Sequence, residues 1–306
     1  MKKLIEFIPN FSVSREHDNE TCEELIKVAE SVKDCMLLDF QSDGNHNRSV
    51  ITMIGTPAGI EEAAFLLCKK AAERIDLRKH TGEHPRMGAT DVMPFVPLKG
   101  TDIGECVELS KRVAKRIWEE LRIPSFLYEE SCTREERRNL ANCRRGQFEG
   151  MNEKLQLPEW APDFGERKVH ETAGITAIGA RMPLIAFNVN LDTDDLQIAK
   201  KIAAAIRGSS GGFKYCKALG IPLKDRHIIQ VSMNMVNYEK TPLYYPYEMI
   251  KTLAESYGVK VIESEIIGLT PAKAMLDCAA FYLKAHDFDC MEQVMEYRLM
   301  EEEERN

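Results

Sequence analysis

Apolar positions in the first half of the chain follow two alternating spacings. Short apolar runs at residues 4–11, 35–40, 49–55 and 126–130 predict β-strands, and apolar residues three and four positions apart at 22–32, 60–75 and 103–121 predict helices. Thr56 directly before Pro57 is typical of a helix start, because a capping side chain is followed by proline at the first helical position. The pattern therefore predicts strands and helices that alternate along this half.

The stretch from residue 133 to residue 174 follows no single period. Thr133 and Glu136 have the spacing of a capping box and predict a charged helix behind them. Residues 146–174 combine prolines, glycines and acidic side chains without a sustained repeat. They predict a long ordered loop or an interdomain segment, and long segments of this kind are often functional.

The second half predicts strand, helix, strand, strand, helix and strand, in that order. These elements are expected at residues 183–190, from Thr193 onward, and at 213–221, 228–237, 247–257 and 259–268. The order is that of a split βαβ, or ferredoxin-like, unit. A chain of 306 residues is natural for two domains. We therefore expect an α+β fold with domains at residues 1–180 and 181–306.

Charge and composition narrow the class of protein. A formal net charge of −8 argues against nucleic acid or an anionic membrane as the main partner. No run of eighteen apolar residues is present, which argues against a membrane span. The nine cysteines are dispersed and form no CxxC pair, so we expect reduced thiols in a cytoplasmic protein.

The densest polar chemistry lies in residues 79–95, KHTGEHPRMGATDVMPF. Residues 80–84 match H-x-x-E-H, a pattern of zinc proteases that works only on a helix. Gly82 lies inside the pattern, and Pro85 pushes His84 away from the helical region. We therefore expect no metal site here.

The same residues fit a loop that holds one histidine stiffly. Pro85 restricts the backbone of His84, and histidine can accept and return a proton near neutral pH. Arg86 offers a planar donor fork suited to a carboxylate, and Glu83 or Asp91 can orient the ring. The alternative is that His84 caps a helix end or bonds a carbonyl.

Five motifs occur in one order along the chain and together resemble the glutamate formiminotransferase family, which includes the N-terminal part of formiminotransferase-cyclodeaminase. The motifs are IPNFS near the start, NRSV at 47–50, EHPRMGATDVMPF, PEWAPDFG at 158–165 and GARMPLIAFNVNL at 179–191. The resemblance covers residues 3 to 286. It implies transfer of a formimino group from N-formimino-L-glutamate to N5 of tetrahydrofolate, with tetrahydrofolate as co-substrate and no metal. It also implies two α/β sandwich subdomains whose sheets face across a substrate tunnel, and a homodimer. A cyclodeaminase that uses the product would be a separate protein.

The resemblance also implies roles for individual residues. His84 matches the catalytic histidine, and one imidazole between the incoming and departing nitrogens can serve both. The folate-contact segment maps onto Gly165, Glu166, Arg167, Lys168, Val169, His170, Glu171, Thr172, Ala173 and Gly174. Further substrate-binding candidates are Arg86, Arg181, Asn10, Asp39 and Arg48.

Departures from the family pattern leave other readings open. Gln41 stands where the family commonly has an acid, so Asp39 or Asp43 would have to orient His84 if that acid does so. The alternative functions are a transferase that uses another one-carbon donor with tetrahydrofolate, and a non-catalytic folate-binding module.

Overall fold

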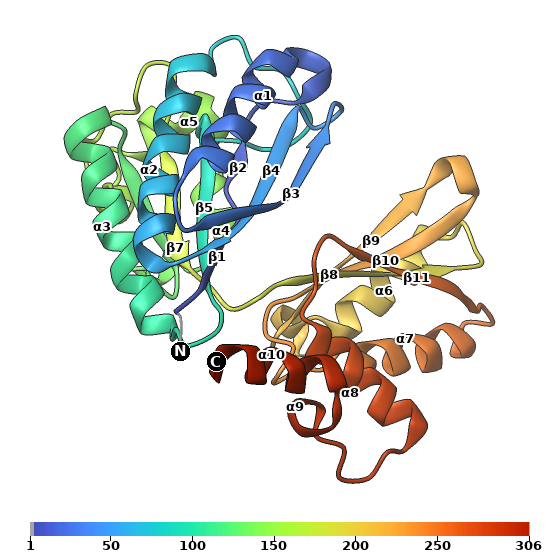
Figure 1. Ribbon diagram of the computed structural model, residues 1–306. Coiled ribbons are helices and arrows are strands. Elements are labelled where there is room, and N and C mark those ends of the chain that lie inside the picture. Colours follow the sequence, from blue (N-terminus) through green and yellow to red (C-terminus); the bar gives the residue numbers. More distant parts are fainter. Residues whose placement is uncertain (1–2, 306) are drawn as a thin grey trace. The chain divides into compact units, whose positions relative to one another are not determined.

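The computed structural model describes residues 3–305, which divide into two compact units. The first unit ends at Arg181 and the second begins at Met182 (Figure 1). Each unit has its own sheet, helices and apolar core, so the fold is mixed α+β with two sheets.

The sheet of the first unit has seven strands and mixed direction. The β3–β4 hairpin forms one side, β1 and β2 both lie between β4 and β5, and β7 and β6 extend the sheet beyond β5 as parallel neighbours. The strands are β1 (Ile5–Phe7), β2 (Asn10–Phe11), β3 (Cys35–Asp43), β4 (Arg48–Gly55), β5 (Thr90–Pro97), β6 (Ser125–Glu129) and β7 (Thr176–Ala180).

Helices cover both faces of this sheet. Met93 and Phe95 of β5 belong to the larger core, which includes residues of α1, α2 and α3, whereas Val92 belongs to a second cluster that includes Cys143 and Met151. Alternate residues of one strand thus point to opposite cores, as the period of a β-strand requires. The helices are α1 (Arg15–Ser31), α2 (Pro57–Arg74), α3 (Ile103–Leu121), α4 (Leu140–Arg144) and α5 (Gln147–Lys154).

The second unit has the split βαβ order. Its strands are arranged β11-β8-β10-β9 and every neighbouring pair is antiparallel. The elements are β8 (Ile185–Leu191), α6 (Leu196–Ile206), β9 (Cys216–Leu223), β10 (Ile228–Met235), α7 (Tyr244–Ser256) and β11 (Val261–Ile267), followed by α8 (Ala272–Leu283), α9 (Cys290–Gln293) and α10 (Met295–Arg305).

The two faces of the second sheet differ in polarity. Phe187, Val189 and Val231 pack in the apolar core with residues of α6 and α7. Asn190 and Gln230 occupy alternate positions and are hydrogen-bonded to each other at 3.0 Å. This polar face continues onto β11. Its Glu263 accepts a hydrogen bond from Asn190, and its Glu265 accepts one from Gln230.

The start of α2 confirms the prediction at Thr56 and Pro57. The Thr56 side chain accepts a hydrogen bond from the Gly59 N–H, and Pro57 is the first helical residue. The start of α6 differs from the prediction, because Asp195 caps the helix by accepting from the Gln197 N–H. Thr193 instead accepts from the Asp195 N–H.

The segment from 133 to 174 corrects two predictions. Thr133 does not cap a helix; its hydroxyl bonds Asp163, which also pairs with the fully buried Arg137. A 3₁₀ turn at Glu135–Arg137 follows it directly, and the short α4 begins later, at Leu140, with Asn139 as its cap. Residues 146–174 were predicted as a long ordered loop or an interdomain segment, but their first part forms α5 and the whole stretch lies in the first unit. A helix of eight residues is too short to show a clear period in the sequence.

Candidate functional site

The loop between α2 and β5 contains His80 and His84 and is irregular from Ile75 to Ala89. The two histidines therefore do not share a helical face, which the zinc-protease pattern needs. Within residues 3–305, no group of three or more His, Cys, Asp or Glu side chains is placed to hold a metal ion.

The C-terminal half of this loop is paired with the end of the 165–174 segment. The Ile175 N–H donates to the Met87 carbonyl at 3.0 Å, and the Ala89 N–H donates to the Ala173 carbonyl at 2.9 Å. At Gly88 a Cβ would lie 2.4 Å from the Ile175 carbonyl oxygen, so only glycine permits this approach. The two segments that the resemblance assigns to catalysis and to folate are thus neighbours.

The N-terminal half of the loop is joined to the turn of the β3–β4 hairpin. The Asn47 amide donates to the Thr81 carbonyl at 2.8 Å, and the Glu83 N–H donates to the Asn45 carbonyl at 3.1 Å. A Cβ at Gly82 would lie 2.5 Å from the His46 carbonyl oxygen. The close approach brings His84 beside the hairpin turn.

His84 is half-buried in a cationic environment. Burial, followed by the positive charges of Arg48 and Arg144, lowers the pKa of His84 to about 4, although the Asp91 carboxylate opposes this shift. The ring of His46 lies edge-on to the ring of His84, with 6.3 Å between centroids and an angle of 86° between planes. His84 is therefore a neutral imidazole at neutral pH.

Asp91 links the loop to one of these cations. One of its oxygens accepts from the Met87 N–H at 2.8 Å, and the other pairs with Arg144 at 2.5 Å. Asp91 is 2% exposed, so its charge is held in place. Of the two acids suggested by the sequence, Asp91 thus acts on His84 through its charge, whereas Glu83 is exposed.

Arg48 and Asn10 form the next part of the site. The Asn10 side-chain oxygen accepts a hydrogen bond from Arg48. The Nε of Arg48 is buried and has no hydrogen-bond partner within residues 3–305. Burial, together with the charge of Arg144, lowers the pKa of Arg48 to about 10. Arg48 thus keeps an unused donor beside His84.

Arg86 lies in the same loop, but its donors are already used. Its guanidinium makes a forked ion pair with Glu149 of α5, with contacts of 2.5 and 2.8 Å, and it also bonds Gln147 and His80. Arg86 is 7% exposed. These contacts anchor the loop to α5. Because the donors of Arg86 are already used, Arg86 is less suited than Arg48 to bind a substrate carboxylate.

Sequence reasoning passed over His46. Its ring donates from Nδ1 to Asp43 at 2.8 Å, and its backbone N–H donates to the other oxygen of Asp43 at 2.9 Å. Asp39 accepts instead from Gln41 at 2.8 Å. Asp43 therefore orients His46 rather than His84. The D-G-N-H sequence is a local signal for an Asx turn, but no local pattern indicates that the turn meets His84.

The 165–174 segment ends in a tight turn. The His170 and Gly174 backbones bond each other at 2.9 and 3.0 Å, and the His170 ring accepts from the Ala173 N–H at 3.1 Å. The three charged side chains before this turn, Glu166, Arg167 and Lys168, are exposed. The His170 ring thus stabilises the turn, and the exposed charges come before it in the chain, with Arg167 bonded to the Gln156 carbonyl at 3.2 Å.

Arg181 lies directly after β7. Its backbone N–H donates to the Phe95 carbonyl at 3.0 Å. Its charge opposes the burial that raises the pKa of Glu6. The charges that act most on His84 are those of Arg48, Arg144, Asp91 and His46.

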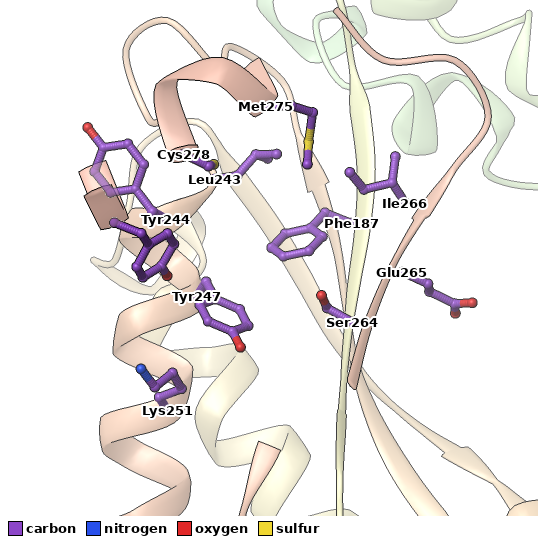
Figure 2. Close-up of a pocket in the computed structure, with 11 residues that line it drawn as sticks. Phe187, Leu243, Tyr244, Tyr247, Lys251, Ser264, Glu265, Ile266, Met275 and Cys278 are labelled. Carbon is purple, nitrogen blue, oxygen red and sulfur yellow. The ribbon is translucent and has the colours of Figure 1, made fainter. Parts of the chain in front are cut away.

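A separate cavity of about 540 Å³ lies in the second unit between α7, α8 and the sheet. Phe187, Tyr247 and Ile266 line it, and Lys251 stands at one end (Figure 2). Lys251 is paired with Glu248 at 3.0 Å, and the carboxylate of Glu265 bonds Gln230 on the polar face of the sheet. Apolar and aromatic side chains make up most of its lining, and no histidine is among the lining residues.

Comparison with known proteins identifies both units. Residues 4–181 match the model of the formiminotransferase domain, N-terminal subdomain, and residues 186–301 match that of the formiminotransferase domain. Glutamate formimidoyltransferase of Streptococcus pyogenes serotype M1 is 59% identical over 98% of this chain and its own full length. Glutamate formimidoyltransferase of Thermoplasma acidophilum is 46% identical over 94% of each chain.

Longer relatives carry a second part. Formimidoyltransferase-cyclodeaminase of Gallus gallus is 40% identical over 98% of this chain but only 56% of its own length. Within the described residues, no helix has the length and apolarity that a membrane crossing would need.

Proposed function

This chain belongs to the formiminotransferase domain family, and we propose that His84 carries the proton transfers of the family's reaction. The enzyme transfers the formimino group from N-formimino-L-glutamate to tetrahydrofolate and releases L-glutamate. The observation that supports the proposal is the position of His84, a neutral and half-buried imidazole among two arginines.

The reaction moves one proton from one nitrogen to another. N5 of tetrahydrofolate attacks the formimino carbon, and the carbon–nitrogen π pair moves to the imino nitrogen. The tetrahedral intermediate must then lose the proton on N5, and the glutamate nitrogen must gain one before its bond to carbon breaks. A neutral His84 accepts the first proton and delivers the second, and such help is typically worth about 10²–10⁴ in rate.

Arg48 supports this reaction as the carboxylate ligand. Its charge acts on His84, and a guanidinium suits a carboxylate in geometry as well as in charge. A bound carboxylate of formiminoglutamate would offset the cations that lower the pKa of His84. The substrate would thereby raise the basicity of His84 once it is in place.

Residues 165–174 are the proposed folate contact. Backbone bonds hold the end of this segment beside Met87, in the loop that carries His84. Exposed Arg167 and Lys168 can meet the glutamate tail of the folate, because their charge is opposite. The roles of Arg181 and Asp39 at the substrate stay predictions, and Arg86 is proposed to hold the loop.

Four further features come from the resemblance and remain proposals. They are a substrate tunnel between the sheets, a homodimer, a cytoplasmic location and a separate cyclodeaminase that consumes the product. Light scattering of the purified protein at several concentrations would test the dimer, since a single monomer mass throughout would contradict it.

Glutamate release provides the test of the function. The protein is mixed with tetrahydrofolate and formiminoglutamate, and release should require both substrates. His84→Ala should lose at least about 10²-fold in kcat while it still binds folate. His286→Ala is the matched control, because His286 is an exposed histidine of the second unit. Full turnover in His84→Ala would remove His84 from the mechanism, and release with a formyl donor alone would indicate a different one-carbon substrate.

A further inference from the structure

A second imidazole lies beside the proposed catalytic one, on a different segment of the chain. His46 belongs to the turn between β3 and β4, whereas His84 belongs to the loop after α2. Their rings meet edge to face at 6.3 Å between centroids. Even with one nitrogen of each ring turned towards the other, this centroid separation is too long for a direct N–H···N bond of about 3 Å, and one water can bridge the two nitrogens.

Asp43 fixes the orientation of this second ring. It accepts the Nδ1–H of His46 at 2.8 Å and the backbone N–H of His46 at 2.9 Å. These bonds hold the pKa of Asp43 below its usual value, so Asp43 is a carboxylate. With Nδ1 committed as a donor to Asp43, Nε2 of His46 is the nitrogen that can accept a proton.

The charges around the two rings differ in sign. Arg48 and Arg144 act on His84 and disfavour its cationic form, whereas Asp91 opposes this effect. His46 has the Asp43 carboxylate on one side and His84 on the other. Because like charges at short range repel, a proton on one ring disfavours a proton on the other, and the Asp43 carboxylate lies on the His46 side.

We propose that His46, oriented by Asp43, stores the proton that His84 removes from N5 until the glutamate nitrogen departs. The inference rests on the function proposed for His84. His46 acts through His84, so it is a positioning and proton-storing residue rather than one that touches the substrate.

The proton balance closes without any further reactant. The N5–H bond breaks, its electron pair stays on N5, and the proton passes to His84. His84 releases a proton through the bridging water to Nε2 of His46, where Asp43 balances the charge. The stored proton then returns through His84 to the glutamate nitrogen. As the bond between carbon and that nitrogen breaks, its electron pair stays on the departing nitrogen, and the electron pair on the imino nitrogen restores the carbon–nitrogen double bond.

The first experiment replaces His46 and measures turnover. His46→Gln should lower kcat by about 10²-fold, with both KM values within about twofold of the wild type. The ring is half exposed, with 49% of its side chain accessible, so added imidazole should restore much of the rate of His46→Ala. His286→Ala is the control, because His286 is also paired with an aspartate, Asp287, at 2.7 Å but lies in the other unit.

The second experiment keeps the turn and removes only the charge. Asp43→Asn can still accept the backbone N–H of His46, so the hairpin should fold, but the stored proton loses its counter-charge. We expect kcat to fall about tenfold and the pH profile of kcat to shift. This variant decides the question if His46→Gln unfolds.

The outcomes separate the two proposals. Wild-type kcat in His46→Gln, together with an inactive His84→Ala, would overturn the storage role and leave His84 in place. A loss in His46→Gln without imidazole rescue of His46→Ala, or an unchanged pH profile in Asp43→Asn, would reduce His46 to a structural anchor. Full activity in His84→Ala would remove both roles.

Discussion

His80 accepts a hydrogen bond from Arg86, with 3.2 Å between Nδ1 of the ring and Nε of the guanidinium. Its other nitrogen, Nε2, donates to the Asn47 carbonyl at 3.0 Å. The ring is therefore the tautomer with its proton on Nε2. It connects the buried Arg86 to the hairpin turn, and burial lowers its pKa below the usual value. His80 therefore holds the loop through these two bonds, whereas His84 is the histidine proposed to carry the proton transfers.

The different roles of His80 and His84 predict opposite effects of replacing them. His80→Ala leaves Arg86 Nε and the Asn47 carbonyl without their partner, and an unsatisfied buried polar group costs about 1–3 kcal/mol. We expect a lower unfolding temperature and a kcat within about tenfold of the wild type. His84→Ala should show the reverse, with near-native stability and little turnover. Thermal unfolding and steady-state kinetics on both variants would measure this, and an inactive, fully stable His80→Ala would contradict it.

The low pKa of His84 predicts a specific pH dependence of stability. The folded pKa is about 4, whereas an unfolded histidine titrates near about 6.5. As the pH falls from about 6.5 towards 4, the unfolded chain takes up a proton that the native protein does not bind, so the free energy of unfolding decreases. Above that window both states are neutral at this residue and the effect disappears.

His84→Ala should therefore lose less stability than the wild type across this window. Denaturant unfolding between about pH 4 and 7 measures the difference. His286→Ala should keep the wild-type slope. Parallel curves for His84→Ala and the wild type would mean that the folded pKa of His84 is not lowered.

Arg48 is expected to affect both substrate binding and the basicity of His84. Arg48→Gln removes the proposed carboxylate ligand and should raise KM for formiminoglutamate by about tenfold or more, since a charged hydrogen bond is worth about 1.5–3 kcal/mol. Because one cation is lost, the pKa of His84 should rise, and the acid limb of kcat/KM should move to higher pH. Arg74→Gln is the control, since Arg74 pairs with Glu20 and Glu24 on the surface. An unchanged KM with an unchanged pH profile would remove Arg48 from the site.

The sequence predicted those parts of the molecule that are determined by residues close together along the chain. The nineteen residues of α3 and the strand–helix order of the second unit follow from apolar spacing, and Thr56 with Pro57 marks the start of α2. The eight-residue α5 was missed because it completes too few turns to show a period.

The parts of the site that the sequence did not predict are contacts between segments that lie far apart along the chain. The pairing of Arg86 with Glu149 joins a loop to a helix far along the chain, and it changes the interpretation of Arg86 from a substrate ligand to an anchor. The contact of His46 with His84 depends on Gly82, whose missing Cβ allows the hairpin turn to approach. Periodicity describes one element at a time, so it cannot show which elements meet.

Gly174 is expected to be indispensable to the connection between the folate segment and the His84 loop. Its φ is +72°, and a Cβ there would lie 2.2 Å from the Met87 carbonyl oxygen, which is backbone and cannot rotate away. Gly211 has a φ of +91° but open space around the same position, so Gly211→Ala isolates the cost of backbone strain, about 1–3 kcal/mol. Gly174→Ala should cost clearly more than Gly211→Ala in denaturant unfolding. Because Met87 accepts the Ile175 N–H, the clash should also displace the loop and weaken folate binding. Equal unfolding costs in the two variants, with unchanged folate affinity, would show that the two segments are not coupled through this contact.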